Sequence, residues 1–271
     1  MKSRIAWRLG WPIRAYLRHS PIRRGKGFLI RRALLPLLPP PPACFKTVLP
    51  GGGQIELYFR ETLGYVTLIY GGFESAELES ARSFARPGTT AFDVGSNVGM
   101  FALVMAGAVG EQGSVVAVEP DPANVRRLRA NLALNKATNV RIVEAAATSL
   151  DGSLLLHLAE DSAYHSLGSV MHARPSTGAV AVEALRLDGI WRDAGEPVVS
   201  LMKIDVEGAE IPVLEGSQHI LTTHHPALLL EASGDLELEA LRAFLASFGY
   251  RRQSRDGYMP WNHLFLWNPG E

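Results

Sequence analysis

The residues best suited to chemistry in this chain are acids and glycines that follow short apolar runs. Residues 92–99, FDVGSNVG, place Asp93 and Asn97 beside two glycines directly after such a run. If a strand ends and a helix begins there, Gly95 and Gly99 would let the backbone approach a ligand, and the helix N-terminus would offer unpaired N–H groups. A pyrophosphate-binding turn prefers the pattern G-x-G-x-x-G, and Asn97 stands where the second glycine would be. The turn therefore favours a nucleotide ligand other than a dinucleotide.

A second acid supports this interpretation. Glu119 ends the next apolar run, SVVAVE, 20 residues after Gly99. A carboxylate at the carboxyl end of a second strand can accept hydrogen bonds from the hydroxyls of a ribose. Together the two motifs predict an adenosine-containing ligand, and the alternative is an ordinary tight turn in which Glu119 only caps a helix.

A third acidic motif is KIDVEGAE, residues 203–210. Asp205 and Glu207 lie on the same side of a strand end, because alternate residues of a strand share a face. Either carboxylate is a candidate general base, or it orients a substrate or binds a divalent cation. No third oxygen ligand is evident nearby, so we predict no metal site. Alternatively, Glu207 and Glu210 only cap the following helix. We interpret Lys203, on a buried strand, as the ion-pair partner of a carboxylate.

Strands and helices alternate along the chain, which predicts an α/β fold. This pattern implies βαβ units and a mostly parallel sheet with helices on both faces. The carboxyl ends of parallel strands meet at one edge of the sheet, so the acids described above are expected to come together. The expected strands are 89–94, 114–119, 140–147, 199–206, 226–231 and 263–267, and the expected helices are 99–109, 121–135, 210–221 and 236–248.

Residues 151–185 interrupt this alternation. Two β-like runs, SLLLHLA and AVAVEAL, flank a polar loop that contains His165 and Ser166. We interpret the segment as an insertion that acts as a lid, and His165 as either a catalytic residue or a solvated loop histidine. Glu74 and Glu77, in GGFESAELE, either contribute to the same pocket or cap a helix.

Charge is unevenly distributed, although the 27 Lys and Arg balance the 27 Asp and Glu. Residues 1–32 carry ten Lys or Arg and no acid, and a proline-rich stretch, PLLPPPP, follows at 36–42. We predict a basic helical arm and connector over 1–44 and one folded domain over 45–271. The arm packs on the body or on a second subunit, or it makes peripheral contact with an anionic membrane surface, and no nucleic-acid partner is expected.

The compartment is predicted from the cysteine content and the hydropathy. The single cysteine, Cys44, excludes an intramolecular disulfide framework and a multi-cysteine metal site, and it suits a reducing compartment. Arginines interrupt the apolar segment that a secretory signal requires. The longest uncharged stretch, 94–110, falls short of the ~18 to 20 apolar residues of a membrane span. We expect a cytoplasmic protein.

Four stretches together resemble the FkbM family of S-adenosylmethionine-dependent methyltransferases: DVGSNVG, VVAVEPDPANVRRLRANLALN, VEALRLDGIW and LMKIDVEGAEIPVLEG. The resemblance spans roughly residues 70–235. It implies the class I methyltransferase fold, a Rossmann-like, seven-stranded, mostly parallel sheet, with S-adenosylmethionine as cofactor. By position it implies contacts with the methionine part of the cofactor from Asp93, Gly95, Ser96, Asn97 and Gly99, with the ribose from Glu119, and with the adenine from Ala146 and Ala147.

The resemblance also implies a reaction. We expect methylation of a hydroxyl on a saccharide, a glycolipid or a secondary metabolite, with the base among Asp205, Glu207 and His165. A cofactor with a sulfonium and an amino acid end suits carboxylates and backbone groups better than an anion cradle. Nitrogen or carboxyl methylation on the same fold, a non-catalytic cofactor-binding scaffold and a nicotinamide-dependent oxidoreductase are the alternatives.

Overall fold

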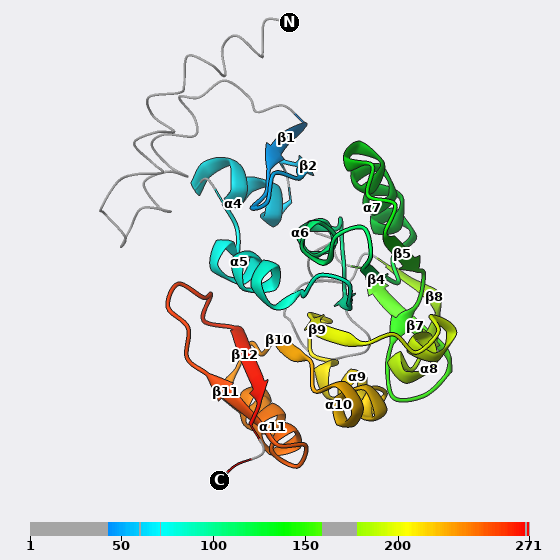
Figure 1. Cartoon of the computed structure of the whole chain (residues 1–271). Coiled ribbons are helices and arrows are strands. Elements are labelled where there is room, and N and C mark those ends of the chain that lie inside the picture. The colour runs from blue at the N-terminus through cyan, green and yellow to red at the C-terminus, as the bar shows by residue number, and fades with distance from the viewer. Residues whose placement is uncertain (1–42, 60, 71, 159–177, 269, 271) are drawn as a thin grey trace, which may run out of the picture. The chain divides into compact units, whose positions relative to one another are not determined.

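The computed structural model describes residues 43–59, 61–70, 72–158, 178–268 and 270 (Figure 1). Most of the predicted basic arm and connector, and His165, lie outside the described residues. The chain divides into two compact units, Met1–Thr47 with Glu56–Phe73, and Val48–Ile55 with Glu74–Glu271. The described part of the first unit contains helix α4 (Thr62–Tyr70) and most of a strand pair formed by β1 (Cys44–Val48) and β2 (Gln54–Tyr58).

The second unit is built on a seven-stranded sheet, which confirms the predicted fold class. Its strand order is β11-β12-β10-β9-β3-β4-β5. The five strands from β10 to β5 run parallel, and β12 runs antiparallel to both β10 and β11. The strands are β3 (Thr90–Val94), β4 (Ser114–Val118), β5 (Val140–Val143), β9 (Val199–Ile204), β10 (Ala227–Glu231), β11 (Tyr250–Gln253) and β12 (Asn262–Trp267).

Helices cover this sheet on both faces, with α5 and α6 on one side and α9, α10 and α11 on the other (Figure 1). Every residue of β3 and β9 is buried, as expected for central parallel strands covered twice. The helices of this unit are α5 (Ser75–Phe84), α6 (Met100–Val109), α7 (Pro122–Asn135), α8 (Leu187–Asp193), α9 (Glu210–Glu215), α10 (Gln218–His224) and α11 (Asp235–Ala246).

Two expected elements are each divided in the structure. The strand expected at 140–147 becomes β5 in the main sheet and β6 (Ala146–Ala147) in a second, three-stranded sheet. The helix expected at 210–221 becomes α9 and α10, which meet near Gly216. A Cβ at Gly216 would lie 2.1 Å from the Thr148 carbonyl oxygen, so this close approach of two backbones requires glycine at the division.

The predicted β-like runs of the insertion are confirmed as strands. They form β7 (Gly152–Leu158) and β8 (Gly178–Leu185), which pair antiparallel, and β6 completes their sheet in the order β6-β8-β7. Residues 159–177, between the two strands, lie outside the described residues, so the lid remains a prediction.

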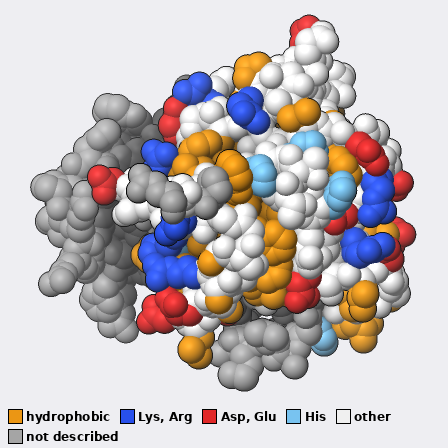
Figure 2. Space-filling view, turned by 60° about the horizontal axis from the view of Figure 1, so that its bottom comes forward, with side chains coloured by type: hydrophobic (Ala, Val, Ile, Leu, Met, Phe, Trp, Pro, Cys, Tyr) orange, Lys and Arg blue, Asp and Glu red, His pale blue; other side chains and the backbone are white. Residues whose placement is uncertain are grey.

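The surface of the described residues mixes charges of both signs. Figure 2 shows acidic and basic side chains interspersed with apolar ones on one face. Within the described ranges, no helix combines the length and the hydrophobicity needed to span a membrane.

Candidate active site

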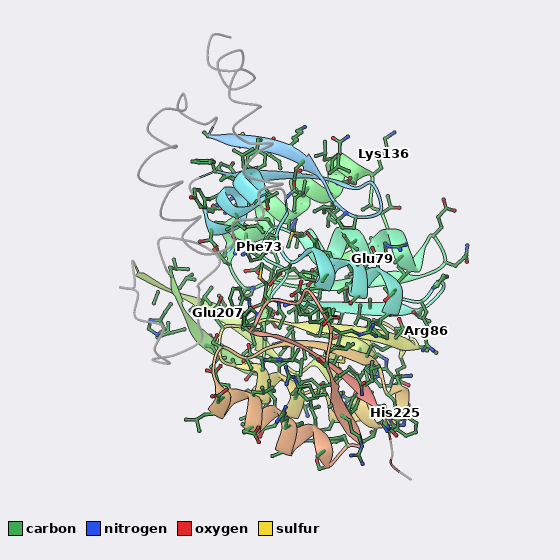
Figure 3. All side chains as sticks on the ribbon, turned by 90° about the vertical axis from the view of Figure 1, so that its left-hand side faces the viewer. Phe73, Glu79, Arg86, Lys136, Glu207 and His225 are labelled. Carbon is green, nitrogen blue, oxygen red and sulfur yellow. The ribbon has the colours of Figure 1, made fainter. Side chains whose placement is uncertain are left out.

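The acidic motifs converge at the carboxyl ends of three neighbouring strands, β9, β3 and β4. Asp93 on β3 pairs in register with Lys203 on β9, and Lys203 pairs with Leu229 on β10. Glu207, just after β9, and Arg86, before β3, lie at opposite ends of the strands (Figure 3). Ligands of open α/β sheets bind beyond the carboxyl ends of the strands, so this edge is the candidate site.

The glycine turn after β3 is fixed by protein contacts. Ser96 Oγ donates a hydrogen bond to the Asp93 carbonyl oxygen at 2.6 Å. A Cβ at Gly95 would lie 1.8 Å from the Asp205 carbonyl oxygen, and a Cβ at Gly99 would lie 2.4 Å from Leu128 Cδ1. Both glycines also have positive φ angles. On the side where a side chain would project, both glycines therefore pack against the protein itself, Gly95 against the residue that follows β9 and Gly99 against α7.

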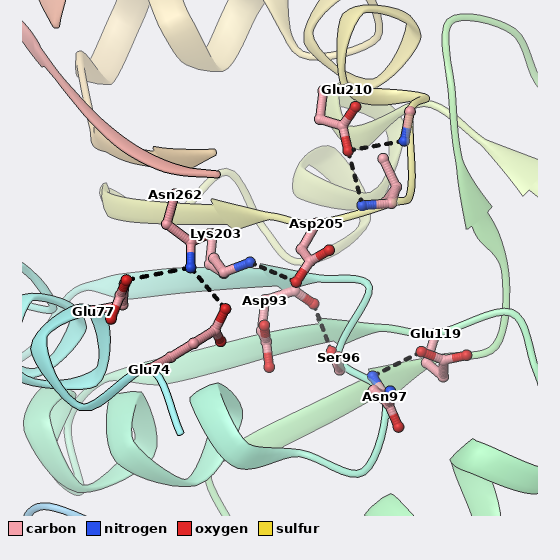
Figure 4. A network of polar contacts seen from close by, with 12 residues as sticks. Glu74, Glu77, Asp93, Ser96, Asn97, Glu119, Lys203, Asp205, Glu210 and Asn262 are labelled. Atoms are coloured by element: carbon pink, nitrogen blue, oxygen red, sulfur yellow. Dashed lines mark hydrogen bonds and ion pairs between the residues drawn. The ribbon is translucent and has the colours of Figure 1, made fainter. Parts of the chain in front are cut away.

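Glu119, the expected ribose ligand, is almost fully buried and holds two turns together. Its Oε2 accepts a hydrogen bond from the Asn97 N–H at 2.7 Å (Figure 4), and its Oε1 accepts from the Asp121 N–H at 2.9 Å and from Asn124 Nδ2 at 3.3 Å. Burial raises the pKa of Glu119 to about 7, and these donors oppose the shift. A carboxylate offers about four acceptor positions, so three protein donors leave room for one further hydrogen bond rather than two.

Asp93 carries the clearest sign of a missing partner. Its side chain is 2% exposed, and its Oδ2 is buried without a hydrogen-bond partner. Burial raises the pKa of Asp93 to about 7, although the Lys203 ammonium and the Ala102 N–H oppose the shift. The buried Oδ1 of Asn97, in the same turn, also has no hydrogen-bond partner. Two orphaned acceptors at the first strand-to-helix turn fit the ammonium group of an amino acid moiety.

Lys203 lies beneath these acids as a buried cation, which confirms its predicted pairing. Its Nζ contacts Asp205 Oδ2 at 2.9 Å, and its side chain is 2% exposed whereas that of Asp205 is 28% exposed. Burial alone would lower the pKa of Lys203, but the carboxylates of Asp205, Glu74 and Glu231 raise it above its usual range. Burial would likewise raise the pKa of Asp205, but Lys203 holds it below its usual value. Asp205 is therefore an anion at neutral pH.

The structure adds a third carboxylate that the sequence analysis missed. Carboxylate oxygens of Asp205, Glu207 and Glu231 lie within 4.8 Å of one another, and all three side chains are half-buried. Burial and the neighbouring Asp205 raise the pKa of Glu231 far above its usual range. Since Lys203 already occupies the cationic position beside Asp205, we assign no metal ion to this group.

A second group of buried polar side chains joins α5 to β12 (Figure 4). Asn262 Nδ2 donates to Glu74 Oε1 at 2.7 Å and to Glu77 Oε1 at 3.4 Å. Glu74 has a left-handed backbone with a φ of 49°, and burial raises its pKa to about 7, against the opposing charge of Lys203. A non-glycine residue in this conformation stores strain of the kind found at functional sites. Glu74 and Glu77 therefore bind Asn262 of β12 next to the candidate site.

Glu210, expected to cap the following helix, is the first residue of α9 and instead binds the turn that precedes it. Its Oε1 accepts hydrogen bonds from the Val206 N–H at 3.1 Å and the Gly208 N–H at 3.3 Å. In this turn Glu207 has a φ of 54°, so its side chain is presented from a left-handed backbone position. Glu210 is thus a structural neighbour of Glu207 and Asp205.

The residues expected beside the adenine are both 2% exposed. Ala146 packs in a small core with Leu156 and Val182, and Ala147 belongs to the main core. Their side chains are therefore engaged within the protein. The backbone of these two residues forms β6, which pairs with β8.

A family model identifies the family of this chain, and the curated relatives are named as methyltransferases. A family model described as "Methyltransferase FkbM domain" matches residues 93–252. "Methyltransferase 1" of Beauveria bassiana is 32% identical over 142 residues, 46% of this chain and 56% of that protein. "Methyltransferase sdnD" of Sordaria araneosa is 31% identical over 152 residues, 46% of this chain and 58% of that protein. The matched regions thus span little more than half of these curated relatives.

A solved structure with the same description matches more weakly. The crystal structure of Methyltransferase FkbM from Methylobacillus flagellatus KT has a TM-score of 0.46 and 19% identity, and the match covers 71% of this chain and 51% of that one.

Proposed function

Because the chain belongs to the family of FkbM methyltransferase domains, we propose that it transfers a methyl group from S-adenosylmethionine to a hydroxyl of a small molecule or glycan. The observation that carries the proposal is the buried Asp93 Oδ2, which has no partner at the turn after β3. A cationic ammonium would supply that partner. Asp205 and Glu207 stand at the adjacent strand end, where an acceptor would meet the cofactor.

The cofactor-binding roles follow from the unused hydrogen-bonding capacity of the turn. Asp93 would bind the ammonium group, and Asn97 Oδ1 offers a second acceptor close by. Glu119 would bind one ribose hydroxyl through its remaining acceptor position and keep its hydrogen bond to the Asn97 N–H. These residues bind by hydrogen bonds to polar groups, which matches a ligand without a pyrophosphate.

The bound cofactor would supply an electrophilic methyl group on a positively charged sulfur. The protein would align the acceptor oxygen with that group, exclude water, and accept the hydroxyl proton. Asp205 is anionic and half-buried, and the buried Lys203 fixes its orientation at 2.9 Å. It is therefore placed to orient an acceptor hydroxyl by accepting its hydrogen bond.

Calorimetric titration tests the cofactor assignment. We expect S-adenosylmethionine and S-adenosylhomocysteine to bind and NAD to give no heat. Asp93→Asn should weaken the binding of both adenosyl ligands by about 5- to 150-fold, because a charged hydrogen bond contributes roughly 1 to 3 kcal/mol. The matched control is Asp193→Asn, which makes the same change at an exposed position of α8. Equal affinities in the wild type and Asp93→Asn would remove Asp93 from the cofactor site.

The reaction itself is tested separately. Protein that binds S-adenosylmethionine would be incubated with panels of hydroxyl, amine and carboxyl acceptors, and the products would be analysed by mass spectrometry. Methylation of hydroxyl compounds is the expected result. Methylation confined to amines or carboxylates would refute the hydroxyl assignment, and cofactor binding without product from any panel would favour a scaffold role.

A further inference from the structure

Glu231 belongs to the candidate site although its strand is distant in sequence from the other motifs. It is the last residue of β10, and the register that pairs Leu230 with Ile204 brings it level with Asp205 at the end of β9. Its carboxylate lies within 4.8 Å of those of Asp205 and Glu207. Three acids from two strand ends and one turn thus share a single small volume.

The charges around this group are strongly unbalanced. Lys203 is the cation that faces it from β9, whereas Asp93 on β3 and Glu74 before α5 add acidic groups around the same lysine. On the β12 side lie Asn262, which pairs in register with Glu231, and the buried His263, whose pKa is lowered by burial. One ammonium cannot neutralise so many carboxylates at short range.

The consequence is that the group retains a proton. Burial and the charge of Asp205 raise the pKa of Glu231, whose carboxyl group lies within 4.8 Å of that of Asp205. Lys203 keeps the ionised form on Asp205. Two carboxyls that cannot both ionise beside each other divide into one acid and one anion. Glu231 is therefore the acid of the pair before any ligand binds.

We propose that Glu231 is the catalytic base of methyl transfer, and that the positive charge of the bound cofactor prepares it by expelling the proton it shares with Asp205. The inference rests on the proposed function and deepens it. A cation at this edge supplies the positive charge that the acids lack, so the ionised form of Glu231 becomes favourable. The orphaned Asp93 Oδ2, buried on β3 at the other side of β9, would bind the ammonium group of the same ligand and so place that ligand at this edge of the sheet.

The proton balance of the cycle then closes. When the cofactor binds, Glu231 loses one proton to solvent. During transfer an oxygen lone pair of the acceptor forms the new C–O bond, the S–CH3 bond breaks with its electron pair remaining on sulfur, and the hydroxyl proton passes to Glu231. The sulfur is then neutral, so the charge that had lowered the proton affinity of Glu231 disappears at the moment when the residue must accept a proton. Asp205 and Lys203 remain an ion pair throughout.

Calorimetry in buffers of different ionisation enthalpy measures this proton directly. The titrations would use the full chain between about pH 7 and 9, with S-adenosylmethionine and S-adenosylhomocysteine as ligands. We expect S-adenosylmethionine to release more protons than the neutral thioether, by about half a proton or more at some pH in this range. In Glu231→Gln the extra proton release should disappear while the ligand still binds. The difference in proton release between the wild type and this variant excludes protons that the ligand itself gains or loses. The matched control is Glu111→Gln, at an exposed position between α6 and β4, which should behave as the wild type.

The outcomes separate this inference from the proposed function. Failure of the wild type to bind either adenosyl ligand would refute the function. If the wild type bound both ligands with equal proton release, the role of Glu231 would be refuted and the proposed function would stand. This result does not require Glu231→Gln to fold. In turnover assays Glu231→Gln should lower kcat by ~100-fold or more, with little change in cofactor affinity. An unchanged kcat would also overturn the assignment.

Discussion

Removing the buried ammonium of Lys203 is the most informative single perturbation of this structure. In Lys203→Met the apolar stem is largely kept and the charge is lost. The side chain is 2% exposed, its Nζ lies 2.9 Å from Asp205 Oδ2, and it also stands 5.0 Å from the ring centroid of Phe101. The variant therefore leaves Asp205 without its counter-ion in a half-buried position.

The magnitude follows from the pair geometry. Two unit charges 2.9 Å apart attract by about 6 kcal/mol at an effective dielectric constant of about 20. The cost of desolvating both ions offsets much of that attraction in the wild type, but the variant keeps the desolvated anion and loses the attraction. Breaking such a pair costs about 3 to 5 kcal/mol of unfolding free energy. For a chain of this size each kcal/mol lowers Tm by about 2 to 4 °C, so we expect a loss of about 6 to 20 °C at pH 8.

The sign of the pH dependence follows from Asp205. Its pKa in the wild type is lowered by Lys203, so its contribution to stability is present above the unfolded pKa and is lost as the pH falls through the folded value. Without Lys203, burial raises that pKa, and the variant loses stability as the pH rises. The difference between wild type and variant should thus be large at pH 8 and smaller at pH 5.

Thermal unfolding followed by circular dichroism at both pH values is the assay. Lys46→Met, at an exposed position of β1, is the matched control and should change Tm little. The double variant with Asp205→Asn should recover part of the loss, because the unpaired charge is then absent. A Lys203→Met protein with wild-type Tm, or a loss that is the same at pH 5 and pH 8, would refute the ion-pair reasoning.

Three further predictions concern the turn and the buried acids. Gly95→Ala should lower the free energy of unfolding in urea by ~2 to 4 kcal/mol, because its Cβ would meet the Asp205 carbonyl oxygen. The control is Gly110→Ala, where φ is also positive but the space is open, so this variant measures the cost of backbone strain alone. Glu119→Gln should weaken S-adenosylmethionine binding by about 1 to 3 kcal/mol in calorimetry, and unchanged affinity would exclude a ribose contact. The pKa values of Glu119, Asp93 and other buried acids are raised to about 7, so their contribution is fully present below the unfolded pKa and is lost as the pH rises through 7. Ligand-free protein should therefore have a lower Tm at pH 8 than at pH 5.5, and the reverse order would contradict these shifts.

The sequence predicts the parts of this site that are local. The strand, the glycine turn and the following helix lie within 20 residues, so their order in the chain defines their arrangement in space. Glu210 is similar, since it caps a turn only two to four residues away. The strand order beyond these units comes from the resemblance to a family and not from periodicity.

The parts that were missed depend on contacts between distant segments. Gly95 allows the close approach of the Asp205 carbonyl, a contact that exists only because β3 and β9 are neighbours. Glu231 was overlooked although it ends a buried run, ALLLE, in the way that Glu119 ends SVVAVE. The signal was therefore present, but only the adjacency of β9 and β10 shows that the acid joins Asp205.

The position of Lys203 explains how neighbouring carboxyls acquire different tasks. Asp205 contacts the ammonium directly and remains an anion, whereas Glu231 lies beside that anion and holds a proton. Environments that separate the pKa values of adjacent acids also separate their chemical roles. An anionic Asp205 can hold an acceptor hydroxyl throughout the reaction, and a protonated Glu231 becomes a base only when a cation arrives. Deprotonation of the acceptor would then depend on the presence of the methyl donor, so Glu231 would act as a base only in the complex that can transfer the methyl group.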